Sequence, residues 1–584
     1  MLPSPDRTQQ PHRAGSFRTV CSLRFLAASA GLLFLASAVL ALRPRLHAHN
    51  PRVLYGVAHL PAAFLYSALI ATAVAFYLPL LQRRARSLTT PFAIGSIVAA
   101  ACLLWLPVVH ASRLSADDWF LVMAASIRHS LAVRPWLAWS AVDTVDGNFR
   151  PLGTIVYLNH GFSLFGFYAG LLLVTLAATL LFFLAQRFGA SRRLALCAAL
   201  IFVSRDLLYG PVVWLCSLGD QLVIVAGAGC ILLLLGSLHA TPRRAVLCHL
   251  GAFLCLLIAL LSKQSAYCIP CLALLTLTLR PGQQRLAATA RPWIVAILTT
   301  AVYSATTLGV FLHARQLAAH HSTPYPVAFR LEGIGYLLRS VVWFFAPVDL
   351  QIIRGFLTAE NLLGAALLAL LLGLLWRRRS RLGIGPREVV FLLLATFASI
   401  ALFLFLPSRR VPYYAGFASL WASLVAAALL VGDEQSAAQR SRLALILGLF
   451  LLGGLSIQIK RTALIPSGTY LGGTYGMDTE AQQFAATQQA LLDAPRATTA
   501  IVYDDSPDSI YPAMICLSST TIRTIYVYRP RTRQWLVNNL NGSMPPDTSD
   551  AWTDVAAFHW NHPLPAPPAL PPPDAVVTLP AAAR

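Results

Sequence analysis

Long, unbroken apolar runs constrain this chain more than any other feature. About a dozen follow one another between residues 20 and 459, and most have roughly the 17–25 residues that cross a bilayer as a helix. Helices are needed because hydrocarbon offers the backbone no hydrogen-bond partner. The sequence therefore predicts an all-α, polytopic membrane domain over residues 20–459. We expect about thirteen transmembrane helices, at 20–42, 53–81, 92–110, 165–186, 194–216, 220–238, 246–262, 265–279, 292–312, 361–376, 388–406, 412–431 and 443–459.

The composition agrees with this class. Apolar residues make up 57% of the chain and charged residues 12%, against about 45–50% and 25% in soluble domains. The net charge of +22 would suit a nucleic-acid-binding protein, but the basic residues lie in short clusters between the apolar runs. Clusters in that position orient membrane helices, so we expect membrane lipids as partners and no nucleic acid.

The basic clusters fall in alternate loops, at 83–86, 187–193, 243–244, 280–291, 377–381 and 440–442. Because short cytoplasmic loops are rich in Arg, we expect the N-terminal tail 1–19 to be cytoplasmic, and loops 111–153 and 313–360 and the C-terminus to be extracytoplasmic. The loop at 43–52 is an exception, since this topology would place its three arginines on the extracytoplasmic side. A single chain without repeats favours the plasma membrane of a bacterium. In the second external loop, the amphipathic aromatic stretch 336–350 suits the plane of the membrane interface.

The composition changes after residue 459. Hydroxyl, acidic and turn-forming residues become frequent, and strand-like segments occur at 500–503 and 524–528, with a helix-compatible segment at 508–517 between them. We expect a small extracytoplasmic α/β domain over 460–562. The Pro- and Ala-rich end, 563–584, is typical of a loose tail.

The loop after the run 92–110 carries an acidic pair, Asp117 and Asp118. An ionisable side chain costs about 2.5–3.5 kcal/mol at mid-bilayer and less near the edge, so a pair beside a membrane helix needs a reason. One reason is structural: the pair would cap an external helix that opens at Trp119. The other is catalytic: one carboxylate would take the proton from an acceptor hydroxyl as a general base.

Four basic residues are expected near the outer ends of helices, against the usual bias: Arg150, Lys263, Arg409 and Arg410. They suit an anionic ligand such as phosphate, because fixed donors in a water-poor site stabilise negative charge strongly. Their side chains would otherwise snorkel toward the lipid headgroups. A base with cations fits sugar transfer from a polyprenyl phosphate: phosphate leaves without a proton, so no second carboxylate is needed. Cationic side chains or a divalent metal ion would balance the leaving charge.

The segments that carry a family resemblance are Ala116-Asp117-Asp118, Phe149-Arg150-Pro151-Leu152, Leu158-Asn159-His160, Phe165-Gly166 and Leu261-Ser262-Lys263. Together they resemble the membrane half of the GT-C glycosyltransferases. The chain is similar to bacterial relatives of the transmembrane O-mannosyltransferases with tetratricopeptide repeats, over about residues 110–430 and without those repeats. The resemblance implies a polyprenyl-phosphate sugar donor, an external site and Asp117 as the catalytic base. The acceptor is then a protein, lipid or polysaccharide.

The chain also departs from this pattern. Where the family has a His-Pro-x-His-x-Glu run, this chain has Arg-Asp-Leu-Leu-Tyr-Gly at 205–210. The family's Ser-Lys-Glu is Ser-Lys-Gln here, at 262–264, whereas its downstream acidic residue is kept as Asp220. Arg205 and Asp206 are expected to form an ion pair with each other. Asn159 and His160 lie on an expected apolar helix, where hydrogen-bonded core polar groups are the alternative to a site role.

Two other classes of function stay open. A transporter or flippase of lipid-linked glycans would have paired inverted repeats and ionisable groups at mid-membrane depth. An inactive structural relative would tolerate the substitution Asp117→Asn. A glycosyltransferase that uses Asp117 as its base would lose transfer on that substitution while the protein still inserts into the membrane.

Overall fold

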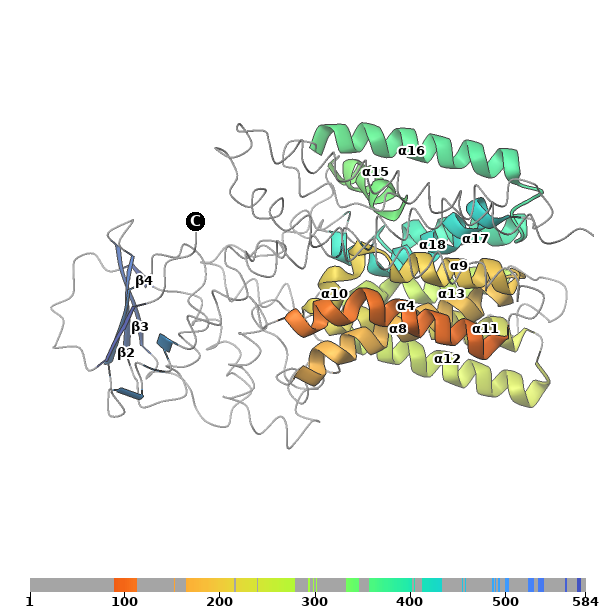
Figure 1. Cartoon of the computed structure of the whole chain (residues 1–584). Helices are drawn as coiled ribbons and strands as arrows, with labels where there is room; N and C mark the ends of the chain where they lie inside the picture. Colours follow the sequence, from red (N-terminus) through yellow and green to blue (C-terminus); the bar gives the residue numbers. More distant parts are fainter. Residues whose placement is uncertain are drawn as a thin grey trace, which may run out of the picture.

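The structure is a computed structural model (Figure 1). It describes residues 89–112, 164–214, 217–238, 240–278, 332–345, 357–401 and 412–432, five strands between residues 499 and 578, and a few single positions. The α-helices are α4 (Thr90–Ala111), α8 (Leu164–Arg187), α9 (Arg192–Val203), α10 (Tyr209–Val213), α11 (Leu218–Ser237), α12 (Pro242–Ser262), α13 (Ile269–Thr278), α15 (Glu332–Phe345), α16 (Leu357–Arg378), α17 (Pro386–Ala398) and α18 (Gly416–Val431). Three 3-10 turns join them: η3 (Asp206–Leu208), η5 (Gln264–Cys268) and η9 (Pro412–Ala415).

Five helices in the described part are long and apolar enough to cross a membrane: α4, α8, α11, α12 and α16. Their bounds lie within a few residues of the predicted runs, because apolar length fixes a membrane helix. Large apolar side chains on α12 and α16, such as Leu247 and Leu362, point outward, as lipid-facing positions do. The chain is therefore compatible with an integral, multi-pass membrane protein. Most of the runs 20–42, 53–81, 292–312 and 443–459 lies outside the described residues.

Two predicted helices are interrupted, and the predicted helix 388–406 is shorter than expected, since α17 ends at Ala398. The run 194–216 is not one helix: α9 ends at Val203, and η3 and the five-residue α10 follow. Pro211 has no backbone N–H to continue a helix. The run 265–279 begins with η5, so α13 keeps only ten residues, too few to cross a bilayer alone. α12 starts at Pro242, four residues before its predicted start at 246, and reaches full length.

A row of aromatic rings holds the centre of the bundle together. Phe188 at the end of α8 packs on Phe391 of α17, with ring centroids 5.4 Å apart. Trp421 of α18 packs edge-on against Phe391 at 5.9 Å and against Phe417 at 5.6 Å. Phe417 in turn fills the space beside Gly227 of α11, where an added Cβ would lie 2.6 Å from its ring. Glycine is therefore required for α11 and α18 to pack this closely.

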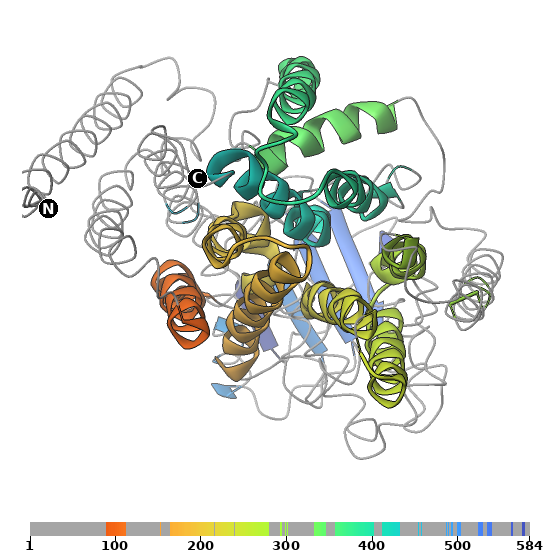
Figure 2. The same cartoon turned by 90° about the vertical axis from the view of Figure 1, so that its right-hand side faces the viewer.

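Three of the predicted arginine loops, at 187–193, 243–244 and 377–381, lie in the described part of the chain and meet at one end of the bundle, which we call the arginine end. Arg378 at the end of α16 donates a hydrogen bond of 2.6 Å to the Leu429 carbonyl near the end of α18. A Cβ on Gly383, in the α16–α17 turn, would lie 3.2 Å from Leu194 of α9. α11 begins where α9 and α10 end, so the α11–α12 turn returns to this end too (Figures 1 and 2).

α15 contains most of the predicted amphipathic stretch, but its aromatic face is buried in protein. Tyr336, Trp343 and Phe344 are almost fully buried. They cluster with Leu207 before α10 and with Ile400 after α17. An amphipathic helix that finds an apolar protein surface buries its face there, so these side chains do not lie in the lipid interface. Residues 346–350 lie outside the described part.

The C-terminal region contains a five-stranded sheet in the order β4-β3-β2-β1-β5. The predicted strands are present as β1 (Thr499–Tyr503) and β2 (Thr524–Arg529), which pair in parallel; β3 (Gln534–Asn539) and β4 (His562–Pro563) continue the sheet antiparallel. β5 (Ala575–Thr578) pairs in parallel with β1, so the predicted loose tail supplies an edge strand. Its Val-Val-Thr sequence has strong strand propensity, which the Pro-rich composition concealed. The expected helix at 508–517 lies outside the described residues.

Candidate functional site

The structure describes two of the nine predicted site residues, Asp220 and Lys263, and brings them together. Seven lie outside the described residues: Asp117, Asp118, Arg150, Asn159, His160, Arg409 and Arg410. The described part of the site centres on Asp220 and Lys263. It occupies the end of the bundle opposite the arginine end.

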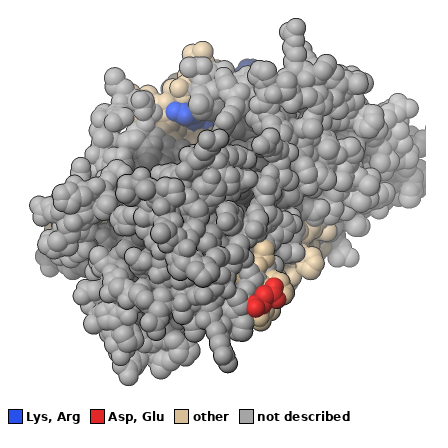
Figure 3. Space-filling model, turned by 90° about the vertical axis from the view of Figure 1, so that its left-hand side faces the viewer, with Lys and Arg blue, Asp and Glu red and all other residues tan. Residues whose placement is uncertain are grey.

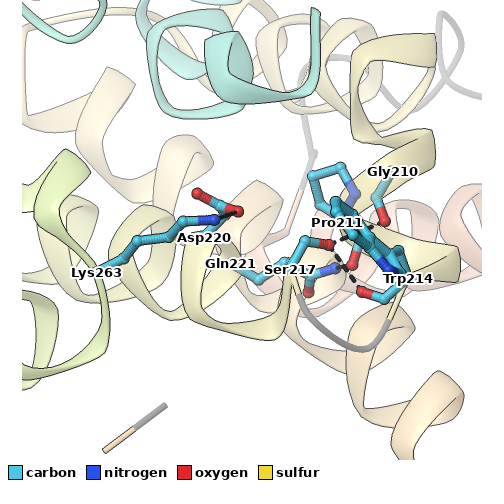
Figure 4. A network of polar contacts seen from close by, with 7 residues as sticks. All are labelled: Gly210, Pro211, Trp214, Ser217, Asp220, Gln221 and Lys263. Carbon is cyan, nitrogen blue, oxygen red and sulfur yellow. Dashed lines mark hydrogen bonds and ion pairs between the residues drawn. The ribbon is translucent and has the colours of Figure 1, made fainter. Parts of the chain in front are cut away.

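Asp220 and Lys263 form an ion pair although they lie 43 residues apart in the chain (Figure 4). The Lys263 ammonium donates to Oδ2 of Asp220. Only 7% of the Asp220 side chain and 9% of the Lys263 side chain are exposed. Asp220 was predicted to be an external polar residue of undefined role, and Lys263 to contact phosphate or lipid. Their burial makes each the main electrostatic partner of the other, because little water remains to screen them.

The helix hairpin of α11 and α12 explains why these two residues meet. The helices run antiparallel through a short turn, so the start of α11 and the end of α12 lie at the same end. Asp220 lies in the first turn of α11, where the helix dipole favours a negative charge. Lys263 directly follows α12, where the dipole favours a positive charge. Its extended backbone, with φ −165° and ψ 152°, ends the helix there.

Tyr414 adds a third element to the pair. Its ring centroid lies 5.0 Å from Nζ of Lys263, within the range of a cation–π contact. Tyr414 belongs to η9, the turn that leads into α18. The ammonium is thus held between a carboxylate from α11 and an aromatic face from η9.

Ser217 and Gln221 attach the broken helix to the start of α11. The Ser217 hydroxyl lies 3.0 Å from the Gly210 carbonyl and 2.8 Å from the Trp214 carbonyl, and it donates to them. Gln221 donates through Nε2 to the Pro211 carbonyl, and Figure 4 shows its side chain directed toward α10 while Asp220 points to Lys263. The Gly210 and Trp214 carbonyls also accept backbone hydrogen bonds, from Trp214 and Ser217, so the Ser217 hydroxyl is a second donor to them. Gln221 supplies a side-chain donor to the Pro211 carbonyl at the break. The sequence Ser-Leu-Gly-Asp at 217–220 has the spacing of a capping box, but the Ser217 side chain makes no cap hydrogen bond at the start of α11.

Arg205 is a second buried cation at this end of the bundle. Only 4% of its surface is exposed, and it follows the last residues of α9. The neighbouring Val203 carbonyl accepts a 2.9 Å hydrogen bond from Nε1 of Trp105, which joins α4 to the break. The side chain of Asp206 lies outside the described part, so the predicted Arg205–Asp206 ion pair stays a prediction.

Asp220 neutralises the charge of Lys263, so a phosphate bound there would have to share or replace this carboxylate. On the face shown in Figure 3, the described Lys or Arg atoms lie apart from the described Asp or Glu atoms. Within the described residues, no three His, Cys, Asp or Glu side chains lie close enough to hold a metal ion.

Comparisons with known proteins assign no family to the chain. No family model matches it, and no curated protein matches it significantly.

Proposed function

We propose that the protein is an inverting membrane glycosyltransferase that moves a sugar from a polyprenyl phosphate to an acceptor on the extracytoplasmic side. The observation that supports this best is the burial of Lys263 beside Asp220 and Tyr414 at the end of the bundle opposite the arginine end. Lys263 belongs to the segment Leu261-Ser262-Lys263, which carries part of the family resemblance. Burying a lysine is costly, and a phosphate ligand gives a reason for it.

The arginine end supports the proposed side of the membrane. Its loops carry Arg187, Arg192, Arg243 and Arg244, among others, and such loops stay in the cytoplasm. Lys263 then faces the extracytoplasmic half of the membrane. Polyprenyl-phosphate donors present their sugar at the membrane surface, so an ammonium at the end of membrane helices is well placed for their phosphate.

In the proposed reaction, a carboxylate of the acidic pair, Asp117 before Asp118, takes the proton of the acceptor hydroxyl. The acceptor oxygen attacks the anomeric carbon of the sugar while the bond from that carbon to the phosphate oxygen breaks. The phosphate leaves with the electron pair, and Lys263 balances its charge. Arg409 and Arg410, which precede η9 in the sequence, and Arg150 are the further cations proposed for the donor. Asn159 and His160 are proposed to line the acceptor side, and Asp220 holds Lys263 in place.

A second function has an observation of its own. The break between α9 and α11, with buried Arg205 nearby, resembles the discontinuous helices that transporters place at a substrate site. A flippase for lipid-linked glycans would use the same phosphate contact but would break no bond.

Mass spectrometry of envelope glycans tests the proposal. A strain that lacks the gene is complemented with the wild type, Asp117→Asn, Lys263→Gln or, as a charge-matched control at the arginine end, Arg243→Gln. At equal membrane abundance, we expect the sugar to return with the wild type and the control, and to fall by roughly 100-fold or more with the other two. Full restoration by Asp117→Asn and Lys263→Gln would contradict the proposal.

A second assay separates transfer from transport. The purified protein is placed in vesicles that contain a radiolabelled polyprenyl-phosphate sugar. With an envelope extract added as the source of acceptor, a transferase moves the labelled sugar off the polyprenyl phosphate, so label leaves the donor lipid. A flippase leaves the label on the lipid and changes only the fraction that an impermeant oxidant reaches.

A further inference from the structure

The C-terminal half of α16 carries an outward stripe that changes in character along its length. Ala369 and Leu372 are exposed on one face, Leu372 at 48%, and Trp376, one turn after Leu372 on the same face, is 72% exposed. Arg379 follows on this face and is exposed as well. α16 is the least buried of the five candidate membrane helices and lies at the edge of the bundle (Figures 1 and 2). This stripe is open to whatever surrounds the protein.

The order of side chains in the stripe matches the layers of one bilayer leaflet. Apolar residues suit the hydrocarbon layer, tryptophan is enriched at the interface, and arginine suits the headgroup layer. The guanidinium of Arg379 lies 4.4 Å from the ring centroid of Trp376, so the aromatic and basic positions form one unit. Stacking on the ring leaves the edge of the guanidinium, with its N–H donors, available for an anion.

The arginines of the run 377–381 divide into two kinds. Arg378 turns inward and donates to the Leu429 carbonyl, which fixes the end of α16 to α18. Arg377, Arg379 and Arg381 are exposed, three like charges within five residues. In the described part of the chain, none of these three forms an ion pair; the nearest acidic residue in sequence, Glu388, folds back against Gly385 at the start of α17. An external anion would relieve their repulsion.

We propose that this end of α16 binds an anionic phospholipid, with its phosphodiester held by Arg379 and the neighbouring exposed Arg377 and Arg381, and an acyl chain along Ala369 and Leu372. Bidentate guanidinium–phosphate contacts favour arginine at such a site. Basic clusters directly beside a membrane helix attract anionic headgroups in general, but here a stacked tryptophan and an exposed apolar track extend the contact to the lipid chains. The proposal does not depend on the glycosyltransferase activity.

The test uses the full-length protein in nanodiscs that contain phosphatidylcholine and phosphatidylglycerol in equal amounts. Native mass spectrometry after release measures which lipids stay bound. We expect the wild type to retain phosphatidylglycerol over phosphatidylcholine by at least about tenfold. Equal retention of the two lipids would overturn the proposal. Glycerol phosphate at millimolar concentration should not displace the lipid; displacement would show that the headgroup alone is held, and that result would also overturn it.

Two charge-matched triple variants locate the site. Arg377→Gln/Arg379→Gln/Arg381→Gln should reduce the preference for phosphatidylglycerol by about tenfold or more, because each arginine near a surface contributes severalfold. The control, Arg187→Gln/Arg243→Gln/Arg244→Gln, removes the same charge from exposed positions of the arginine end outside α16 and should keep the preference. An equal loss in both would mean general attraction to a basic surface, and no loss in the first would mean that α16 is not the site. Thermal unfolding confirms that each variant is folded; if the first is not, the wild-type lipid preference decides.

Discussion

At the scale of single residues, the ion pair of Asp220 and Lys263 is expensive for a membrane protein to maintain. Taking each charge out of water costs several kcal/mol, and their mutual attraction offsets this only with good geometry. Both charges lie at favourable helix ends, and Tyr414 adds a cation–π contact. Since an apolar pair would hold the helices together as well, stability alone does not explain why the charges are there.

Stability measurements can separate a structural role of the pair from a role in ligand binding. The single variant Lys263→Met leaves the Asp220 carboxylate buried without its partner, and we expect it to lower the free energy of unfolding by about 3–5 kcal/mol. The double variant Asp220→Leu/Lys263→Met removes both charges and should recover to within about 1–2 kcal/mol of the wild type. Unfolding by a denaturing detergent in mixed micelles measures both. Asp493→Ala, at an exposed position, is the control and should change little.

The double variant gives the decisive result. If its stability recovers while sugar transfer stays lost, the pair serves function. A double variant as unstable as the single one would instead mean that the pair holds α11 and α12 together, and Lys263 would lose its proposed role as a phosphate ligand.

At the scale of helices and strands, the sequence predicts some elements well and others poorly. α8 spans Leu164–Arg187, and the prediction was 165–186. The two agree because the length of a continuous apolar run, bounded by polar residues, determines where a membrane helix begins and ends. The run 194–216 is equally apolar, yet it breaks, since hydropathy does not register the missing N–H of Pro211 or the bonds that Ser217 and Gln221 supply to the broken end.

The candidate site shows the same limit. Lys263 was found from its place at the end of an apolar run, where a basic residue is unusual. Its partner Asp220 was noticed only through the resemblance, because pairing across 43 residues depends on how α11 and α12 fold back on each other. Tyr414 and Gln221 carry no signal that would separate them from ordinary core residues before the packing is known.

The crossing of α15 and α16 gives a test at this scale. A Cβ on Gly364 of α16 would overlap the Leu338 carbonyl of α15, and a backbone atom cannot move aside as a side chain can. We expect Gly364→Ala to lower the free energy of unfolding by about 1–3 kcal/mol, as overpacking does. Gly373→Ala is a matched control in the same helix, where an added Cβ meets nothing within 4 Å. It should leave stability unchanged or raise it by up to about 1 kcal/mol, since alanine favours the helix. Equal effects of the two substitutions would contradict the close crossing.

At the scale of the whole molecule, the charges divide the described bundle into two ends. The turn after α8, the turn after α11 and the turn after α16 carry exposed arginines and meet at the arginine end. The buried pair lies at the other end. The same division was expected from alternate loops of the sequence, and the helix directions agree with it. The proposed reaction needs the arginine end in the cytoplasm, because the buried pair must face the side on which the acceptor lies.

Labelling of introduced cysteines tests that orientation. Thr241→Cys in the α11–α12 turn and Ser380→Cys in the α16–α17 turn are exposed at the arginine end. Ser322→Cys lies in the loop that the sequence predicts to be external. An impermeant maleimide added to intact cells should label Ser322→Cys and should reach the other two only after permeabilisation, because basic loops remain in the cytoplasm. The parent protein, with its native cysteines, gives the background to subtract. If Thr241→Cys and Ser380→Cys were labelled in intact cells and Ser322→Cys were not, Lys263 would face the cytoplasm, and the sugar donor would have to be used there. Labelling of Thr241→Cys without Ser380→Cys would contradict the shared arginine end itself.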